Sequence, residues 1–223
     1  MRTKINDKTG TLDFDTLPAA EWHIDDHGLL VIAPPAGRNR AVLAAAGSFD
    51  MSVGGRAPWR SRAGDVKGVL VKPGVVALGH ATGLFGGLKN LVPADVSELD
   101  VSLVDDMGSM FGFCPSLQSL DLRGWDVSHV DSMDGMFKCC SSLRSLDLSG
   151  WDVSLVGSDI FQGMNSMFCG CSSLESLSLR SWDVTWMKDG NMDSMFKGCF
   201  SLRSLDLTGC DDESAARLRA LLP

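Results

Sequence analysis

Cysteines and histidines are the residues of this sequence whose side chains could act as nucleophiles, general bases or metal ligands. The chain has seven cysteines and four histidines, and the odd number leaves at least one cysteine outside any internal disulfide. Four cysteines recur at intervals of 26, 31 and 28 residues: Cys114, Cys140, Cys171 and Cys199. The other three, Cys139, Cys169 and Cys210, fall outside this register.

The spacing of the recurring cysteines favours a structural role over metal binding or catalysis. Tetrahedral metal sites prefer matched pairs of ligands, and the C-C and C-x-C pairs here have no matching partners. A nucleophilic cysteine needs a base, and no histidine recurs beside them. Because each one follows a phenylalanine by three residues, we expect an inward-facing structural ladder. Its members are Phe111, Phe137, Phe168, Phe196, Cys114, Cys140, Cys171 and Cys199.

Two further segments are similar in sequence to ligand-binding motifs but lack features that those motifs need. His23 and His27 have the spacing of an H-x-x-[ED]-H zinc motif, which needs both histidines on one face of a helix. Gly28 follows directly and predicts a turn instead. The glycine-rich residues 79–90 lack the spacing of a phosphate-binding loop. The sequence therefore predicts no catalytic, cofactor-binding or metal site, and no enzyme.

An internal repeat supplies the elements that position these residues. Four copies occupy residues 99–124, 125–150, 151–181 and 182–209, and a degenerate copy precedes them. Each contains L-x-x-L-x-L at the period of a leucine-rich-repeat coil. The last two leucines alternate, which predicts a short strand, residues 119–123 in the first copy, stacked on its counterparts in a parallel sheet. The M-x-x-M-F spacing predicts a short helix or 3-10 turn on the opposite wall.

The predicted fold is an α/β repeat, a leucine-rich-repeat-like solenoid over residues 76–209, with the parallel sheet on one wall and short helices or 3-10 turns on the other. Residues 1–75 are expected to form a small β cap, with a hairpin at 21–34 and a loop at 36–65. Residues 210–223 predict a capping helix that Asp211 or Asp212 begins, with its leucines covering the last coil. These leucines are Leu218, Leu221 and Leu222.

The solvent-facing positions of the predicted strands form a polar column. Its members, with the two flanking arginines, are Asp121, Asp147, Ser178, Asp206, Arg123 and Arg180. Like charges one coil apart repel each other and cost some stability unless they are paired. The column is either a solvated face with arginine counter-ions or a polar surface that binds a ligand such as a basic protein segment or a cation.

Two insertions fall at the same point of the coil, between the tryptophan position and the methionines. Insertions in repeat proteins project from one face, where partners often bind. If they are exposed, Ile160, Phe161 and Trp186 would form an apolar anchor patch for a partner. The alternative is that they fold back over a wider local core.

Charge and hydropathy exclude several classes of partner. A net charge of -8 provides no basic footprint for nucleic acid or for an anionic membrane surface. Apolar runs stay well below the roughly 18 residues that span a bilayer, so we expect no membrane insertion. The first fifteen residues are polar where a signal peptide would be apolar, which leaves a cytoplasmic location open.

The repeat W-D-V-S-x-V-x-x-M-x-x-M-F-x-x-C-x-S-L-x-S-L-D-L closely resembles that of the BspA-like leucine-rich-repeat surface proteins of bacteria. The similarity extends over roughly residues 84–210. It implies a solenoid, a location at the cell surface or outside the cell, and a role in adhesion or in binding host and matrix molecules.

Two classes of function are therefore open. The first is a non-enzymatic binding module that recognises a protein or a glycan through an extended solenoid surface, without a cofactor. The second is a structural or assembly protein whose coil edges stack, or an intracellular scaffold for protein interactions. The sequence leaves the oligomeric state open.

Overall fold

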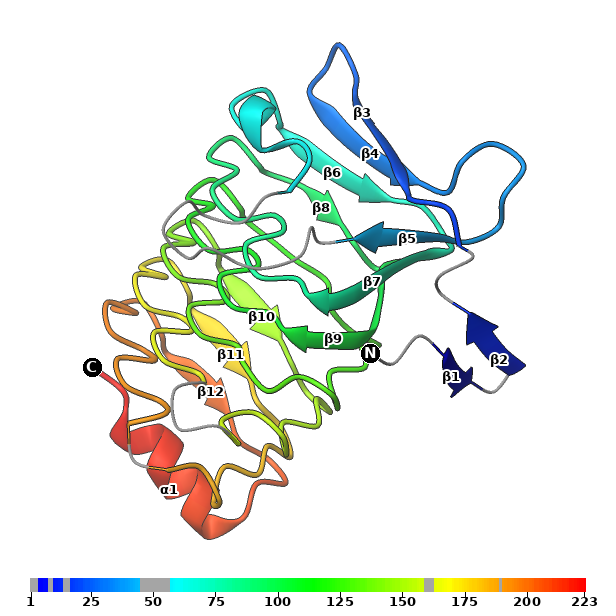
Figure 1. Ribbon diagram of the computed structural model, residues 1–223. Helices are drawn as coiled ribbons and strands as arrows, with labels where there is room; N and C mark the ends of the chain where they lie inside the picture. Colours follow the sequence, from blue (N-terminus) through cyan, green and yellow to red (C-terminus); the bar gives the residue numbers. More distant parts are fainter. Residues whose placement is uncertain (1–3, 8–9, 14–16, 45–56, 159–162, 189) are drawn as a thin grey trace.

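The computed structural model describes residues 4–7, 10–13, 17–44, 57–158, 163–188 and 190–223. The chain winds into a stack of coils that runs from the hairpin formed by β3 (Glu21–Ile24) and β4 (Leu29–Ala33) to the C-terminal helix α1 (Asp212–Ala220) (Figure 1). Two short strands, β1 (Lys4–Asp7) and β2 (Gly10–Asp13), pair with each other in antiparallel orientation ahead of the stack. A 3-10 helix lies at Arg60–Arg62.

Strands from the leucine-rich segments line one wall of the stack. β10 (Ser145–Asp147), β11 (Ser176–Ser178) and β12 (Ser204–Asp206) form a parallel sheet with the leucines in register, Leu146 beside Leu177 and Leu177 beside Leu205. The alternation explains the pairing, because Leu146 and Leu177 are buried while the serines and aspartates on either side face outward. The prediction of a parallel sheet is confirmed.

The N-terminal half contributes a second sheet in the order β3-β4-β6-β8, which includes β6 (Gly68–Val71) and β8 (Ala94–Asp95). β3 and β4 form the expected hairpin, and β4, β6 and β8 are parallel. Parallel stacking thus begins at Leu29, well before residue 76. A continuous core cluster of described residues extends from Leu30 to Leu218, so the N-terminal segment and the repeats share one hydrophobic core.

The predicted strand at residues 119–123 is not formed as a regular strand. Its side chains still alternate, with Leu120 and Leu122 buried and Asp121 and Arg123 exposed. The backbone joins the next coil where the N–H of Arg144 donates to the carbonyl of Gln118, over a long 3.4 Å. The leucine pattern at residues 119–123 therefore predicts which side chains point inward, but these residues do not form the full set of hydrogen bonds of a strand.

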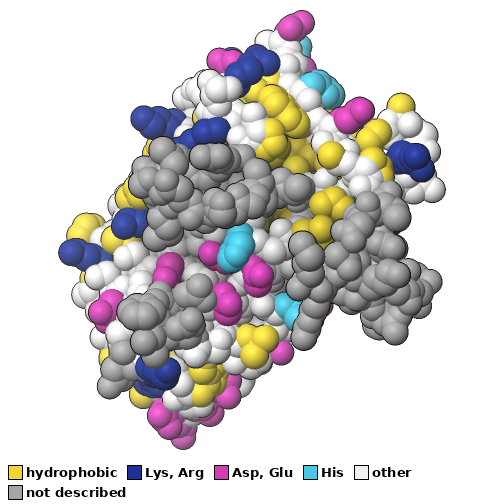
Figure 2. All heavy atoms as spheres, in the orientation of Figure 1, with side chains coloured by type: hydrophobic (Ala, Val, Ile, Leu, Met, Phe, Trp, Pro, Cys, Tyr) yellow, Lys and Arg dark blue, Asp and Glu magenta, His cyan; other side chains and the backbone are white. Residues whose placement is uncertain are grey.

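A three-stranded parallel sheet on the neighbouring wall was not predicted. It consists of β5 (Ala41–Ala44), β7 (Val75–His80) and β9 (Asp100–Asp106). β5 lies inside the segment expected to be a loop. At the C-terminal end of β7, His80 Nδ1 lies 3.5 Å from a carboxylate oxygen of Asp105 and 3.6 Å from one of Asp106. Figure 2 shows a histidine among acidic side chains on this face.

The methionine-rich wall is built of successive turns closed by hydrogen bonds between residues three apart, as from the N–H of Met110 to the carbonyl of Met107 at 3.1 Å. This is the bonding of a single 3-10 turn, and no continuous helix forms along the described residues of this wall. A left-handed residue interrupts each segment twice, at Ser109 (φ 50°) and Phe113 (φ 60°) in one coil and at Ser166 (φ 57°) and Gly170 (φ 79°) in another. A right-handed helix cannot continue through such residues. In the described part of the chain, α1 is the one α-helix.

These turns free backbone groups to join the coils together. The N–H of Phe111 donates to the carbonyl of Met136 in the next coil, and the N–H of Phe137 donates to that of Met167, each at 2.9 Å. Inside a helix the same N–H groups would bond to residues of their own coil. The turn wall therefore stabilises the stack much as a sheet would.

A stack of aromatic rings runs through the core between these walls. Phe85, Phe111, Phe137, Phe168 and Phe196 are completely buried, and successive ring centroids lie 5.4, 6.0, 5.6 and 5.6 Å apart. Trp59 continues the stack below Phe85 at 5.9 Å. Each coil thus supplies one ring, and each internal ring is packed on both faces by neighbouring coils.

The last coil is closed by α1. The carboxylate of Asp211 accepts a hydrogen bond from the N–H of Ser214 at 2.9 Å, as expected for the N-cap of this helix. Leu218 is fully buried against the core, and Leu221 is partly buried. Leu222 lines a hollow with Leu202 and Leu205 of the last coil and is 39% exposed, so it covers that coil only in part. None of the described helices is long and apolar enough to cross a membrane.

Both borders of the longer insertion are held by adjacent coils. The N–H of Gly157 donates to the carbonyl of Asp131 at 2.8 Å, and the buried amide of Asn191 donates to the carbonyl of Gly157 at 3.1 Å. On the other side, the N–H of Met133 donates to the carbonyl of Gly163 at 2.8 Å. Gly157 and Gly163 are therefore both held at fixed points of the stack.

Candidate functional site

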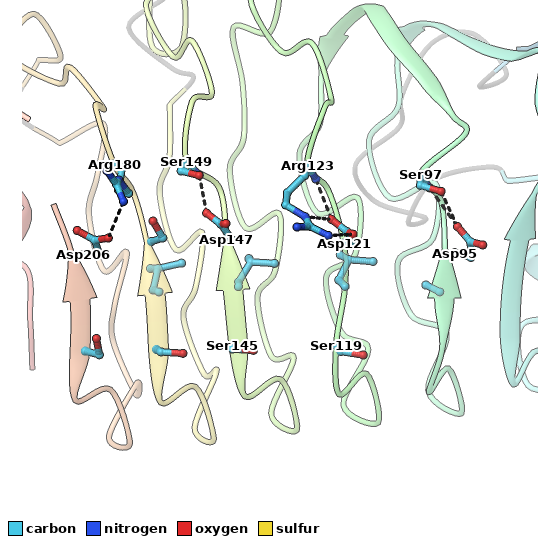
Figure 3. A pocket seen from close by; sticks show the side chains of 17 residues that line it. Asp95, Ser97, Ser119, Asp121, Arg123, Ser145, Asp147, Ser149, Arg180 and Asp206 are labelled. Atoms are coloured by element: carbon cyan, nitrogen blue, oxygen red, sulfur yellow. Dashed lines mark hydrogen bonds and ion pairs between the residues drawn. The ribbon is translucent and has the colours of Figure 1, made fainter. Parts of the chain in front are cut away.

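A polar groove of about 880 Å³ runs along the strand wall, across the coils. Figure 3 shows that the outward side chains of five consecutive strand segments line it in rows. One row is formed by serines at the start of four of these segments: Ser119, Ser145, Ser176 and Ser204. The next row consists of Asp95, Asp121, Asp147, Ser178 and Asp206. In β10, β11 and β12, strand pairing sets a spacing of about 4.8 Å between neighbouring members of these rows.

The groove brings together six residues that the sequence singled out. They are Asp121, Arg123, Asp147, Ser178, Arg180 and Asp206. All of them are exposed except Ser178 and Asp206, which are half-buried. The alternation of the leucine segments aims these side chains outward, and the register aligns them from coil to coil.

In the segment next to β8, Asp121 and Arg123 form a two-point ion pair. The guanidinium donates through Nε to Oδ1 at 3.0 Å and through Nη2 to Oδ2 at 2.8 Å, and the N–H of Arg123 also donates to Oδ1. These hydrogen bonds lower the pKa of Asp121 to about 2. The pair therefore neutralises this position of the row at neutral pH.

Asp206 is similarly engaged in β12. The hydroxyl and N–H of Thr208 donate to its carboxylate at 2.6 and 2.9 Å, and Arg180 Nη1 lies 3.9 Å away. These contacts, led by the hydrogen bond from the Thr208 side chain, hold the pKa of Asp206 below its usual range. The carboxylate is ionised at neutral pH.

Asp147, in the middle of the groove, makes no ion pair within the described part of the chain. Its carboxylate accepts a hydrogen bond from the N–H of Ser149 at 3.0 Å, and hydrogen bonding to Ser149 lowers its pKa. The side chain is exposed, so most of its acceptor positions face solvent. The centre of the groove is therefore anionic and open, while arginines lie beside Asp121 and Asp206 on either side of it.

The lowered pKa of Asp121 predicts how acid affects stability. A carboxylate whose folded pKa lies below its unfolded value of about 3.9 stabilises the fold above that value, and the contribution is lost as pH falls toward the folded pKa. For Asp121 the loss lies between about pH 4 and about pH 2. We expect the free energy of unfolding of Asp121→Asn to fall less than that of the wild-type protein between these two pH values. Urea denaturation at several pH values in this range measures the difference. The effect is small because solvent screens the pair. If the free energies of unfolding of the two proteins fell equally over this pH range, the prediction would be contradicted.

Of the three residues assigned to an apolar anchor patch, the structure describes only Trp186. Ile160 and Phe161 lie outside the described residues. Trp186 is half-buried and packs against the main core cluster, away from the polar groove. For Trp186 the packing corresponds to the alternative in which the side chain folds back over the core.

The four recurring cysteines are buried and point across the coils. Each thiol lies against the carbonyl of the phenylalanine one coil before, at 3.2 Å from Cys114 to Phe85 and 3.1 Å from Cys140 to Phe111. Cys171 and Cys199 make the corresponding contacts with Phe137 and Phe168, each at 3.1 Å. Burial raises the pKa of all four thiols, to about 11 for Cys114 and Cys199. At neutral pH they remain protonated, which makes them poor nucleophiles.

A second hollow of about 420 Å³ lies over the turn wall and was missed by the sequence analysis. Its lining includes Phe113, which is 49% exposed, with Lys138 Nζ 5.9 Å from the ring centroid, and the carboxylates of Asp106 and Asp134. Burial raises the pKa of Asp134. These residues come from two coils and occupy no common repeat position, so the sequence offers no signal that would group them. Within the described residues, no cluster of three or more His, Cys, Asp or Glu side chains could hold a metal ion.

Comparisons with known proteins give a family match and distant structural matches. A family model described as "Mycoplasma protein of unknown function, DUF285" matches residues 79–209, more than half of the chain. A leucine rich cell surface protein from Faecalibacterium prausnitzii is 16% identical with a TM-score of 0.40, and the match covers 96% of this chain and 42% of that one. A leucine-rich repeat protein from Bacteroides ovatus is 14% identical with a TM-score of 0.37, over 86% of this chain and 53% of that one.

A third solved structure, a leucine-rich repeat protein from Eubacterium ventriosum, is 12% identical with a TM-score of 0.26, over 87% of this chain and 84% of that one. The chain thus spans about half or less of the length of the first two proteins. No curated protein matches the sequence.

Proposed function

The chain belongs to the family described as "Mycoplasma protein of unknown function, DUF285", and since that description names no activity, we propose from the polar groove that it is a non-enzymatic binding module. The ligand is an extended segment of a partner protein that lies across the coils. The repeats supply a rigid scaffold, and the outward side chains of the strands make the contacts.

The observation that carries this proposal is the row of acidic and hydroxyl side chains in a groove that crosses five strand segments. A ligand that uses the whole row must be extended, because the row itself is linear. Four aspartates line the groove against two arginines, and the two arginines lie close to Asp121 and Asp206. The open carboxylate of Asp147 then favours a lysine or arginine of the partner at the centre.

A glycan is the second candidate, and the row of four serines favours it. Their hydroxyl groups can both donate and accept hydrogen bonds, as the hydroxyl groups of a sugar chain do. The two ligands differ in charge. Binding of a basic peptide requires the charge of Asp147 and weakens as salt is added. Binding of a neutral oligosaccharide does not require that charge and does not weaken with salt.

Removal of the central charge tests the proposal. The probes are an array of basic, acidic and neutral oligopeptides together with neutral and charged oligosaccharides. We expect basic peptides to bind, and Asp147→Ser to weaken them about tenfold, equivalent to about 1.4 kcal/mol. Asp152→Ser is the matched control, since Asp152 is an exposed aspartate at the start of the next repeat, lies outside the groove, and accepts a hydrogen bond from the N–H of Ser154 as Asp147 does from that of Ser149. Equal affinity of the two variants for basic peptides, or wild-type protein that binds no probe, would count against the groove.

We also propose that the module acts at the cell surface in adhesion, as the BspA-like resemblance implies. Protease treatment of intact source cells, followed by detection with an antibody to this chain, checks this. Removal of the chain from whole cells supports a surface role. Protection until lysis, with a cytosolic protein as the control, would redirect the search to intracellular partners.

The alternative of an assembly protein that stacks through its coil edges has less support. At the first coil, β3 pairs with the outer edge of β4 in antiparallel orientation. At the last coil, α1 packs against the core through Leu218. Both described ends of the stack are therefore covered by an element that does not continue the parallel pairing.

A further inference from the structure

Two of the three cysteines outside the repeat register meet in adjacent coils. The backbone N–H of Cys139 donates to the carbonyl of Cys169 at 2.7 Å. Standard bond lengths tie each Cα to the bonded atom, so the two Cα atoms are no more than about 7 Å apart. Disulfides in proteins span Cα to Cα distances of about 4.4 to 6.8 Å. The backbone thus already holds the pair within reach of a bond.

The side chain of Cys139 leans toward the coil that carries Cys169. A Cβ placed on Gly170, the residue after Cys169, would lie 3.3 Å from the Cys139 sulfur. Gly170 has no side chain, so the sulfur of Cys139 packs directly against the backbone next to Cys169. The sulfur of Cys139 therefore already lies beside the residue that follows its proposed partner.

Accessibility separates this pair from the structural ladder. Cys139 and Cys169 are each partly exposed, while Cys114, Cys140, Cys171 and Cys199 are buried. Thiol exchange needs a thiolate that solvent and oxidant can reach. The third partly exposed cysteine, Cys210, directs its sulfur to the carbonyl of Leu179 at 3.3 Å.

We propose that Cys139 and Cys169 form a thiol–disulfide exchange site whose substrate is a small disulfide such as glutathione disulfide. The thiolate of one cysteine attacks a sulfur of the substrate, the substrate S–S bond breaks, and one glutathione thiolate leaves and takes up a proton. The thiolate of the second cysteine then attacks the protein sulfur of the mixed disulfide. A second glutathione leaves, and a bond between Cys139 and Cys169 remains. Two protein thiols are oxidised, and one glutathione disulfide is reduced to two thiols.

The product would tie two neighbouring coils together on the turn wall. Cys139 belongs to the repeat at residues 125–150 and Cys169 to that at 151–181, so the bond closes a loop that contains the longer insertion. A cross-link of this kind limits the unfolded chain more than the folded one. The inference rests on the turn wall and does not depend on what the polar groove binds.

The test incubates the full chain with buffers of reduced and oxidised glutathione, blocks free thiols with an alkylating agent under denaturing conditions, and maps the peptides by mass spectrometry. We expect the number of free thiols to fall from seven to five, with a peptide pair joined at Cys139 and Cys169. A Cys210→Ser variant should give the same cross-link. A higher thermal midpoint for the oxidised chain should disappear on reduction.

Cys139→Gly serves as the matched control, because the corresponding position of the next coil is Gly170, which shares the left-handed backbone of Cys139. The variant should therefore fold, as circular dichroism can verify, and give no cross-link. Three outcomes would overturn the proposal. Cys139 and Cys169 could stay free, each could carry a glutathione without a bond between them, or they could cross-link to other cysteines.

Discussion

Phe137→Ala should lower the free energy of unfolding by about 3 to 5 kcal/mol, as expected for truncation of a fully buried aromatic ring. Phe137 is 0% exposed and is stacked between Phe111 at 6.0 Å and Phe168 at 5.6 Å. Its loss leaves a cavity and removes two ring contacts at once. Urea denaturation followed by circular dichroism measures the change.

The control for this variant is the same substitution at Phe200, which is 81% exposed. Phe200→Ala should change the free energy of unfolding by no more than about 0.5 kcal/mol, as surface substitutions usually do. Similar losses for the two variants would contradict the assignment of Phe137 to the central stack. A small loss for Phe137 alone would mean that the coils can close around the missing ring.

Leu146→Ala should cost about 2 to 5 kcal/mol, the range for a buried leucine whose removal leaves a cavity. Leu146 is 4% exposed at the centre of β10, beside Leu177 of β11. Because it lies in a middle coil, neighbours on both sides lose contacts when it is shortened. Thermal and urea unfolding of the variant measure the loss.

Arg144→Ala is the matched control in the same repeat. Arg144 is exposed, and its side chain lies 3.7 Å from Glu175 in a solvent-facing ion pair of a kind that contributes little. Its backbone N–H and carbonyl, which bond to neighbouring coils, are unaffected by the substitution. We expect an almost unchanged free energy of unfolding. An effect equal to that of Leu146→Ala would refute the inward and outward assignment of the strand wall.

The features that could be predicted from the sequence are those that depend on local pattern. Alternating leucines gave the strands β10 to β12, and the turn at Gly28 gave the hairpin of β3 and β4. The helix cap could be narrowed to Asp211 or Asp212, because a short acceptor side chain precedes the helical residues, and the structure shows Asp211 in that role. In each case a few neighbouring residues decide the conformation.

The turn wall could not be predicted because its spacing is ambiguous. Methionines three residues apart suit one side of a helix and also suit two successive turns. The distinction depends on left-handed backbone at Ser109 and Phe113, and neither residue type is a usual sign of that conformation. Bonds to adjacent coils compensate for the cost, and such bonds are invisible in one repeat read alone.

The candidate site was also predictable only in part. The polar column followed from alternation and register, since one outward position per repeat is enough to place it. The second hollow could not be predicted from alternation and register, because Asp106, Phe113 and Asp134 meet only when coils of unequal sequence are stacked. The pairing of Cys139 with Cys169 was hidden for a related reason, since the two residues occupy neighbouring positions, not equivalent ones, in their repeats.

The fixed borders of the longer insertion make this point of the stack suited to the display of foreign sequence. Gly157 and Gly163 are each held by hydrogen bonds to a neighbouring coil. We therefore expect a graft of different length or composition between these glycines to leave the two anchor points in place. Exchange of this one segment would then change what the protein displays while the scaffold stays constant.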